Sequence, residues 1–235
     1  MRTIGLIGGM SWESTVPYYQ IINRVVGARL GGLHSAKIVL YSVEFAEIEA
    51  MQREGRWEDS GKVLAGAARA VRRAGADFIV LCTNTMHKVA PQIEAAVDVP
   101  LLHIADATAA RVKAAGVRRV GLLGTRFTME QDFYRGRLEA RHALSVLTPP
   151  DEARALVHGV IYGELCIGRL RPESREGFRQ VVDELVGRGA EGVILGCTEI
   201  GLLLRPEDAA VPLWDTASIH AEAAADYALG GELPS

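Results

Sequence analysis

The stretch RGAEGVILGCTEI, residues 188–200, is matched by RAGADFIVLCTNT, residues 73–85. In each stretch a Gly-Ala pair leads into a short apolar run, which ends in a cluster of small polar side chains. This composition is typical of a buried strand that opens into a helix. The two copies therefore predict polar groups at the carboxyl ends of two strands, where open α/β sheets bind their ligands.

Two further pairs of segments repeat in the same order. RTIGLIGG, residues 2–9, resembles RRVGLLGT, residues 118–125. VPLLHIADATAA, residues 99–110, resembles VPLWDTASIHAE, residues 211–222. The separation between partners is nearly the same in all three pairs, so the chain looks like two copies of one half.

Short β-rich runs alternate with amphipathic helical runs, which favours a parallel α/β fold. We expect two pseudo-symmetric parallel α/β lobes with flavodoxin-like sheets, which face each other across an active-site cleft. The first lobe is expected to comprise residues 1–104 and 217–235, because the last helix, 216–229, should pack back on the first half, and the second lobe residues 105–216. Strands are predicted at 3–7, 36–43, 78–81, 119–123 and 192–195.

The composition excludes several classes of protein. The chain has 235 residues, is 49% hydrophobic and 23% charged, and carries a net charge of −3 without a basic stripe. Nucleic acid is therefore not an expected partner. No run approaches the roughly 18 apolar residues of a membrane span, and the N-terminus lacks a signal-peptide pattern. Together with an odd, sparse set of three cysteines, this favours a cytoplasmic protein with reduced thiols and no membrane partner.

No cofactor motif is found in the sequence. Cys82 and His87 lie near each other in CTNTMH, but no CxxC or HExxH motif follows, so no metal is expected. The GGMS that follows the first strand is a tight turn and not a GxGxxG dinucleotide loop.

The paired polar strand ends suggest a chemistry. One group that removes a proton from a carbon and another that returns a proton to its opposite face would invert that carbon. A thiol suits this role, because its ordinary pKa of about 8.5 can be lowered at a helix N-terminus. In the ungapped alignment of the repeat, Thr83 matches Cys197 and Cys82 matches Gly196. Since neighbours in a strand point to opposite faces, Thr83 is the expected partner of Cys197, and Cys82 is the alternative if the strand carries a bulge.

The motifs IGLIGGMSWEST, CTNTMHK, LGTRFTMEQDFYRGRL and GCTEIGLLL together resemble the aspartate/glutamate racemase family, whose members racemise amino acids without pyridoxal phosphate. The resemblance covers essentially the whole chain and points to the bacterial L-Asp/Glu-specific and broad-specificity amino-acid racemases. It implies cofactor-independent α-proton abstraction and reprotonation, which interconverts L- and D-amino acids. It also implies a homodimer, since the family is often dimeric.

The resemblance assigns roles to the strand-end residues. The family carries Cys-Asn-Thr in its first half and Gly-Cys-Thr in its second. The second motif is intact here, whereas Thr83 stands where the first cysteine would be. Cys197 is then the base toward the L-substrate and Thr83 the acid on the other face. Glu199 follows where the glutamate racemases carry a histidine, and is expected to support Cys197.

Other residues are expected around the substrate. The family likeness makes Met10 and Ser11 substrate neighbours, and Gln52 and Thr125 are similar candidates. Backbone amides at helix N-termini suit the substrate α-carboxylate, and the candidates are those of Asn84, Thr85, Thr198 and Glu199. His87 and His103 are interpreted as structural. No residue matches the family's cations for a distal carboxylate cleanly, although Arg53 or Arg126 could take that place.

Two alternatives share the predicted architecture. A maleate isomerase or arylmalonate decarboxylase also works with cysteines in facing halves, and it would turn over maleate or an arylmalonate. A two-lobed small-molecule binding protein would bind its ligand without chemistry. The side-chain specificity, acidic or broad, stays open at this level.

Overall fold

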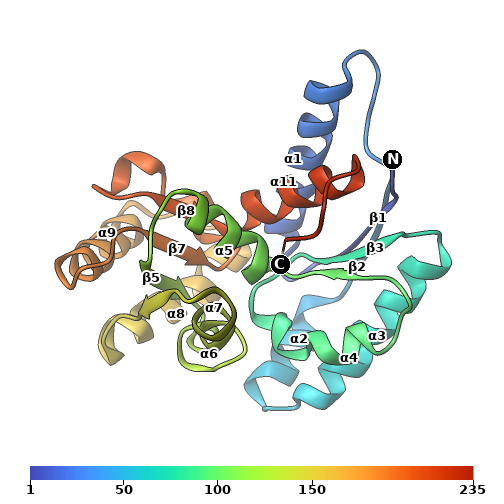
Figure 1. Ribbon diagram of the computed structural model, residues 1–235. Coiled ribbons are helices and arrows are strands. Elements are labelled where there is room, and N and C mark those ends of the chain that lie inside the picture. Colours follow the sequence, from blue (N-terminus) through green and yellow to red (C-terminus); the bar gives the residue numbers. More distant parts are fainter. Residues whose placement is uncertain (235) are drawn as a thin grey trace. The chain divides into compact units, whose positions relative to one another are not determined.

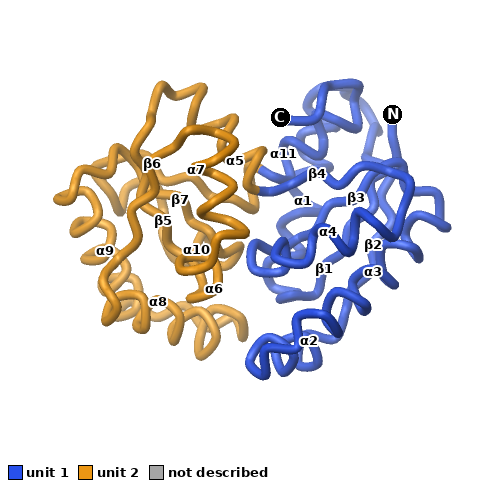
Figure 2. The backbone as a smooth tube through the Cα atoms, turned by 60° about the horizontal axis from the view of Figure 1, so that its bottom comes forward, with its two compact units in different colours: residues 1–104, 220–235 blue, residues 105–219 orange. Residues whose placement is uncertain are grey.

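The computed structural model describes residues 1–234. Over this range the chain divides into two compact units, shown in different colours in Figure 2. Unit 1 contains residues 1–104 and the C-terminal segment from His220, and unit 2 contains residues 105–219. Each unit contains a four-stranded parallel sheet within the described residues. The predicted α/β fold class is confirmed.

Unit 1 has the strands β1 (Ile4–Gly8), β2 (Ile38–Ser42), β3 (Phe78–Leu81) and β4 (Leu101–Leu102), in the spatial order β2-β1-β3-β4. Its helices are α1 (Trp12–Leu30), α2 (Phe45–Arg53), α3 (Trp57–Arg73), the 3-10 helix η1 (Thr85–Val89) and α4 (Ala90–Glu94), together with the part of α11 (Thr216–Ala228) that begins at His220. The order is that of flavodoxin-like sheets, whose ligands bind beyond the carboxyl ends of the strands.

Both faces of this sheet are covered by helices. Ile79 and Leu81 of β3 belong to a core shared with residues of α2, α3 and α4, among them Leu64. Phe78 points to the other face, where its ring packs edge-on against Tyr227 of α11, with the centroids 4.8 Å apart. Figure 1 shows α1 and α11 on the side of the sheet opposite α2, α3 and α4. The odd and even residues of β3 are therefore divided between two buried layers.

Unit 2 has the strands β5 (Arg119–Gly124), β6 (Ser145–Leu147), β7 (Val193–Gly196) and β8 (Leu213–Asp215), in the order β6-β5-β7-β8. Its helices are α5 (Ile104–Ala114), α6 (Arg126–Glu130), α7 (Arg135–His142), α8 (Asp151–Gly163), α9 (Pro172–Gly187), α10 (Ile200–Leu203) and the first residues of α11, with the 3-10 helices η2 (Leu165–Ile167) and η3 (Pro206–Asp208). The order repeats that of unit 1, strand for strand.

The core of unit 2 lies between β7 and the helices α8 and α9. Val193 and Leu195 belong to this core with Ile161, Phe178 and Leu185. Each large apolar side chain buried in this way stabilises the unit by about 1.5–3 kcal/mol. The core anchors β7, so the residues that follow Gly196 start from a fixed strand end.

The five predicted strands all exist, and their ends shift by at most two residues. The largest difference is at β2, which is two residues shorter than predicted at its start and one shorter at its end. The predicted set omits β4, β6 and β8. Strands of two or three residues are too short to show an alternating pattern, so only their pairing with β3, β5 and β7 identifies them.

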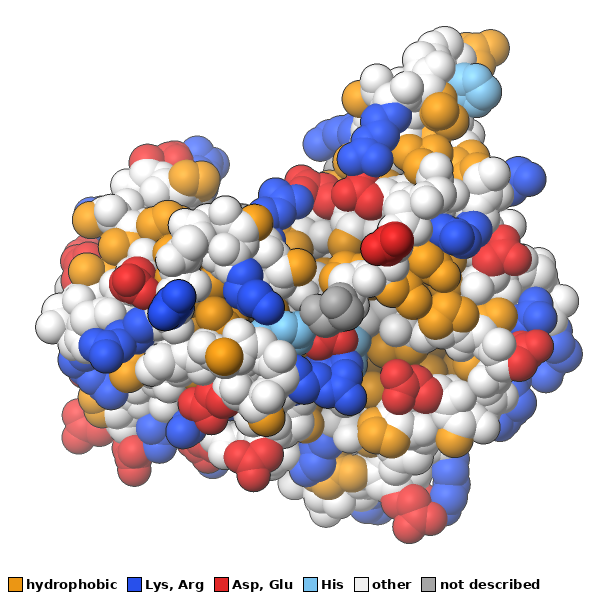
Figure 3. Space-filling view, in the orientation of Figure 1, with side chains coloured by type: hydrophobic (Ala, Val, Ile, Leu, Met, Phe, Trp, Pro, Cys, Tyr) orange, Lys and Arg blue, Asp and Glu red, His pale blue; other side chains and the backbone are white. Residues whose placement is uncertain are grey.

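Charged side chains of both signs are interspersed over the face drawn in Figure 3. This mixture agrees with the small net charge of the chain. Within residues 1–234, no helix combines the length and the apolar character needed to cross a membrane.

Candidate active site

The sheet register relates the strand ends of the two units. Ile7 of β1 pairs with Leu81 in unit 1, and Leu123 of β5 pairs with Leu195 in unit 2. One residue further, Cys82 donates its backbone N–H to the Ile7 carbonyl at 2.9 Å, and Gly196 pairs with Gly124. Cys82 is therefore the counterpart of Gly196, and the next residue, Thr83, is the counterpart of Cys197. The structure gives the same correspondence as the ungapped sequence repeat.

The backbone around Thr83 is held on both sides. The Thr83 N–H donates to the Leu81 carbonyl at 2.8 Å, so the chain turns as soon as β3 ends. The Thr83 carbonyl lies 2.7 Å from Nδ1 of His87, whose Nε2 accepts the Ile104 N–H at 3.3 Å. Since Nε2 is the acceptor, Nδ1 carries the proton and donates it to Thr83. His87 is a structural residue that fixes the position of Thr83.

Cys82 lies in the packed interior of unit 1. Its side chain is completely buried, and its thiol lies 3.8 Å from the Val80 carbonyl. Burial raises the pKa of the Cys82 thiol well above its ordinary value. A buried neutral thiol of this kind is a packing residue with little acid–base reactivity at neutral pH.

The loop after β1 requires a glycine. Gly9 has a φ of 90°, and a Cβ on it would lie 2.4 Å from the Val43 carbonyl oxygen. Its N–H donates to Oγ1 of Thr15 at 2.9 Å, and that hydroxyl donates to the Ser11 carbonyl at 2.8 Å. Met10 and Ser11, the predicted substrate neighbours, are both buried in this tied loop.

Gln52 is a buried residue at the end of α2, and its Nε2 donates to Sδ of Met86 at 2.9 Å. Asn84 and Thr85 are also buried and lead directly from Thr83 into η1. The contact between Gln52 and Met86 therefore joins α2 to the segment that carries Thr83. Arg53, by contrast, is exposed and pairs with Glu49 at 2.8 Å on the same helix.

In unit 2 three predicted residues lie together after β7. The Cys197 thiol donates to Oε2 of Glu199 at 3.0 Å, and the Thr198 hydroxyl donates to the same oxygen at 2.8 Å. All three side chains are buried. Cys197 and Glu199 are thus joined by a direct thiol–carboxylate hydrogen bond.

The expected lowering of the thiol pKa at a helix N-terminus is wrong for Cys197, whose surroundings favour the protonated thiol. Burial raises the pKa of its thiol well above the ordinary value, and the negative charge of Glu199 raises it further. A thiol with a raised pKa is scarcely ionised at neutral pH, but its thiolate is a strong base once formed. The carboxylate that accepts the S–H proton is already in contact with it.

Cys166 is a neighbour that the sequence analysis did not place. It lies in η2 and packs against the core cluster that contains Cys197. Burial, and then the charge of Glu199, raise the pKa of the Cys166 thiol. No strand-end motif surrounds this residue in the sequence, so no local signal marks it.

Thr125 begins α6 as its N-cap residue. Its Oγ1 accepts the Thr128 N–H at 3.3 Å, and the two hydroxyl oxygens lie 3.2 Å apart. The N–H of Arg126 donates to Nδ1 of His158 at 3.2 Å. Thr125 thus follows β5 directly, as Gly9 follows β1. Among the side chains of residues 1–234, no group of three or more His, Cys, Asp or Glu is placed to hold a metal ion.

Comparison with known proteins assigns the family. The sequence model of the family described as Asp/Glu/Hydantoin racemase matches residues 7–224. A Yersinia pestis protein provisionally described as an Asp/Glu racemase is 58% identical, and its structure superposes with a TM-score of 0.90 over 97% of this chain and 100% of that one. An aspartate racemase homologue from Pyrococcus horikoshii OT3 is 36% identical, with a TM-score of 0.83 over the same shares, 97% and 100%.

A curated relative extends the same family. The broad-specificity amino-acid racemase RacX of Bacillus subtilis (strain 168) is 23% identical over 226 residues, which cover 93% of this chain and 95% of the relative. The family model spans most of the chain. Thr83 and Cys197 follow equivalent strands of the two sheets of this chain, in the same register. The chain belongs to the Asp/Glu/Hydantoin racemase family.

Proposed function

We propose that this protein, an amino-acid racemase of the Asp/Glu/Hydantoin racemase family, inverts the α-carbon of its substrate with Cys197 and Thr83 acting on opposite faces. The observation that carries the proposal is the hydrogen bond from the Cys197 thiol to Glu199, 3.0 Å long, at the end of β7. It pairs a buried thiol with a group that can take its proton. The equivalent position of unit 1 carries the hydroxyl of Thr83, which we propose as the second group that transfers a proton.

In the direction from the L-enantiomer, the thiol first passes its proton to Glu199, which leaves a thiolate on Cys197. The thiolate removes the α-proton, so an S–H bond forms as the C–H bond breaks. The carbanion then takes the hydroxyl proton of Thr83 on its other face. Water returns a proton to the Thr83 alkoxide, and Glu199 releases its proton to solvent, which closes the cycle. A proton carrier in contact with its acceptor is what general acid–base catalysis requires.

The substrate α-carboxylate is proposed to bind backbone amides at the two strand ends. Helix N-termini favour anions, because their N–H groups lack intrahelical partners. The contributing amides would be those of Asn84, Thr85, Thr198 and Glu199. Met10, Ser11, Gln52 and Thr125 are proposed as further substrate contacts, and their burial in each unit supports a site protected from bulk water.

The proposed substrates are L-aspartate and L-glutamate, or a broader set of L-amino acids that includes them. The descriptions of the Yersinia pestis and Pyrococcus horikoshii OT3 proteins support the acidic substrates. The description of RacX supports the broader set. The reaction is proposed to need neither pyridoxal phosphate nor a metal, so activity should survive EDTA and carbonyl reagents.

The test is α-proton exchange in deuterated water. A panel of L-amino acids is incubated with the purified protein, and loss of the α-proton signal is followed by proton NMR while D-enantiomer is measured by chiral chromatography. We expect exchange with inversion for aspartate, glutamate or both. Turnover of maleate or an arylmalonate without any amino-acid exchange would contradict the proposal, and so would ligand binding without exchange.

We also propose that the protein is a cytoplasmic homodimer. The absence of disulfides among the three cysteines supports the location. Apolar side chains on the outer surface of α1 support the dimer, because Trp12, Val16 and Tyr19 recur at helical spacing and are 62%, 45% and 56% exposed. Light scattering of the wild type and of Tyr19→Glu should show a dimer that the substitution weakens, and a wild-type monomer at all concentrations would contradict it.

A further inference from the structure

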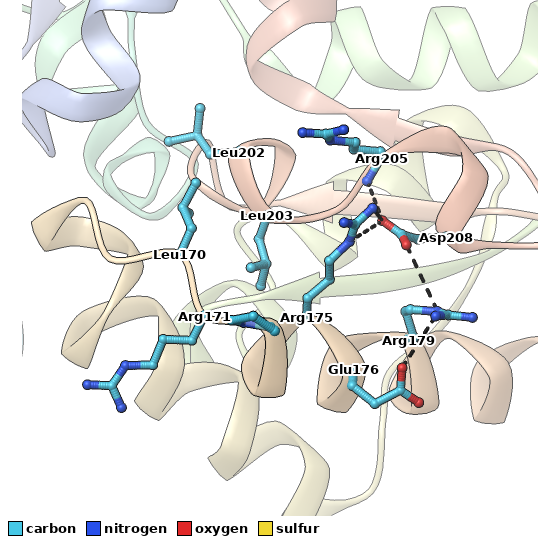
Figure 4. A pocket seen from close by; sticks show the side chains of 10 residues that line it. Leu170, Arg171, Arg175, Glu176, Arg179, Leu202, Leu203, Arg205 and Asp208 are labelled. Carbon is cyan, nitrogen blue, oxygen red and sulfur yellow. Dashed lines mark hydrogen bonds and ion pairs between the residues drawn. The ribbon is translucent and has the colours of Figure 1, made fainter.

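A cavity in unit 2 is lined by residues that are not part of the candidate active site. It has a volume of about 450 Å³ and is bordered by the first turns of α9, the end of α10 and η3. A volume of this size is within the range that small organic ligands occupy. Figure 4 shows the side chains that line it.

Arginines outnumber acidic residues among the side chains that line the cavity. Its lining includes the guanidinium groups of four arginines and the carboxylates of two acidic residues, which are Arg171, Arg175, Arg179, Arg205, Glu176 and Asp208. Arginine presents several donors in a planar fork that matches carboxylate and phosphate oxygens. The lining therefore favours an anion.

Asp208 holds the Arg175 side chain in place. Its buried carboxylate accepts from Nε of Arg175 at 2.9 Å and from the backbone N–H of Arg205 at 2.8 Å, and Arg179 approaches it to 3.9 Å. In Figure 4, Arg175 and Arg179 extend from α9 toward Asp208. The Asp208 charge is thus matched by Arg175, and each of the other three arginines has a more distant acidic partner.

Of the three remaining ion pairs at the cavity, those of Arg179 and Arg205 are solvent-exposed, whereas Arg171 faces a carboxylate that is only 17% exposed. Arg179 pairs with Glu176 at 3.3 Å, with side-chain exposures of 48% and 56%. Arg205 approaches Glu207 only to 4.0 Å, with exposures of 68% and 65%, and Arg171 lies 3.7 Å from Glu164. Exposed pairs of this kind contribute about 0–1 kcal/mol each. A phosphate that makes charge-assisted bidentate bonds can therefore compete for these guanidinium groups.

The opposite wall of the cavity is apolar. Leu170, Leu202 and Leu203 line it, and Figure 4 shows them gathered on the side away from Asp208. Inorganic phosphate would leave this wall uncovered. We propose that the cavity is an effector site for an organic phosphate, whose phosphate oxygens bind the arginines and whose uncharged part covers the leucines.

The cavity shares a wall with the segment that carries Cys197. Leu202 and Leu203 belong to α10, which begins directly after Glu199, and Leu203 lies in the same core cluster as Cys197. A ligand that contacts both α9 and α10 restrains α10, and with it the position of Glu199 beside the thiol. An effect on turnover rests on the proposed racemase function, whereas ligand binding does not.

The experiment measures binding by titration calorimetry with ADP, pyrophosphate and adenosine as probes in magnesium-free buffer. ADP should bind more tightly than pyrophosphate, and adenosine should not bind. Arg171→Gln and Arg205→Gln should each weaken ADP binding by about ten-fold, the loss expected for one charge-assisted hydrogen bond. Arg141→Gln, at an exposed arginine of α7, is the matched control and should bind ADP as the wild type does.

A further variant tests the apolar wall. Leu170 is 52% exposed, so Leu170→Ala should fold normally. It should weaken ADP binding and leave pyrophosphate binding unchanged. Saturating ADP should also change kcat for L-aspartate at least two-fold in the wild type, and should not do so in the double variant Arg171→Gln/Arg205→Gln.

Each outcome decides one part. No ADP binding, or equal binding by the wild type and both arginine variants, overturns the site. Loss of self-association in Arg205→Glu without ADP binding to the wild type overturns it in favour of an interface between copies. ADP binding with an unchanged kcat overturns the effector role. If no α-proton exchange of amino acids is seen in the absence of ADP, the proposed function is contradicted. The calorimetric result then still tests the cavity as a binding site.

Discussion

At the scale of single residues, the thiol of Cys197 differs from that of Cys82 in its contacts. Both are buried, and burial raises the pKa of each. Only Cys197 contacts a carboxylate, that of Glu199, whereas Cys82 has the Val80 carbonyl beside it at 3.8 Å. A carbonyl accepts a hydrogen bond but does not take up a proton at neutral pH, so Cys82 has no route to a thiolate.

The first prediction contrasts the two cysteines. Cys197→Ala should reduce α-proton exchange of the L-substrate by roughly 100- to 10,000-fold, because a positioned acid–base group contributes that much. Cys82→Ala should keep most of the activity and lose stability, since it removes a buried sulfur. Circular dichroism provides the folding control. A folded but inactive Cys82→Ala variant would show that Cys82 is the second proton carrier.

The second prediction concerns the charge beside Cys197. In Glu199→Gln the negative charge that raises the thiol pKa is gone, so the pKa of Cys197 should fall. Alkylation of the Cys197 peptide by iodoacetamide, followed by mass spectrometry across a pH series, should show this shift. The kcat should fall at the same time, because an amide cannot accept the thiol proton. An alkylation profile that does not move would contradict the assigned contact, and Glu199→Asp is the charge-preserving control.

The third prediction concerns Thr83. A hydroxyl is a weaker acid than a thiol, so the L-enantiomer meets a more populated protonation state than the D-enantiomer does. Enantiomers have equal free energies, so kcat/KM must be the same in both directions, and the asymmetry must appear in kcat and KM separately. Thr83→Cys should raise kcat for the D-enantiomer. Progress curves from both enantiomers measure the two kcat values. Equal values in the wild type would contradict the assignment of Thr83 as the weaker acid–base group.

At the scale of elements, the two central strand pairs have the same geometry at their carboxyl ends. β1 with β3, and β5 with β7, end in the same register. At the next position the two units differ, because Cys82 occupies the place of Gly196. Gly196 is crowded: a Cβ on it would lie 2.8 Å from Cδ1 of Leu122 and 2.8 Å from the Leu123 carbonyl. The glycine therefore lets β5 and β7 close together directly before Cys197.

The fourth prediction follows from this crowding. Gly196→Ala should destabilise unit 2 by roughly 1–3 kcal/mol, the usual effect of overpacking a core, and should displace Cys197 enough to lower kcat. Gly187→Ala is the control, since a Cβ at the end of α9 meets no atom within 4 Å. Thermal denaturation of both variants measures the difference. An equal melting temperature for Gly196→Ala and the wild type would show that β7 is less tightly held.

At the scale of the whole molecule, three buried histidines lie in the interior of unit 1. The rings of His87 and His103 are 4.4 Å apart, and those of His87 and His220 are 5.9 Å apart. His220 lies 2.9 Å from both the Tyr18 hydroxyl and the Leu102 carbonyl. Through these contacts His220, at the start of the C-terminal segment of unit 1, joins α11 to α1 and to β4. The cluster connects the two ends of the chain within one unit.

The fifth prediction is the pH dependence of stability that this burial produces. Burial lowers the pKa of His220 from 6.5 to about 4. Between these pH values, the unfolded chain binds a proton at His220 that the folded protein does not bind. The contribution of His220 to stability is therefore fully present above pH 6.5 and is lost as the pH falls toward 4, by about 3 kcal/mol. Urea unfolding of the wild type and of His220→Gln across this range measures the loss, which should be smaller in the variant. His34→Gln, at an exposed histidine, should show the wild-type dependence.

The sequence by itself determined the parallel α/β class, the duplication and the family. Strand signals are local, because the apolar run of β3 or β7 is visible in four consecutive residues. The repeat strengthens the prediction, because the same pattern of strands occurs in both halves of the chain. The pairing of Thr83 with Cys197 could be read in the same way, since a strand fixes which neighbours share a face. The family assignment is confirmed by the match over residues 7–224.

Only the tertiary structure decided the contacts that give these residues their chemistry. The bond from His87 to Thr83, the bond from Gln52 to Met86 and the direction of the Glu199 carboxylate all depend on rotamers chosen by packing. The arginine-lined cavity joins α9 to η3, which are separated in the sequence by β7 and α10. Contacts of this kind leave no local pattern, because long-range packing, and not the order of neighbouring residues, brings the side chains together.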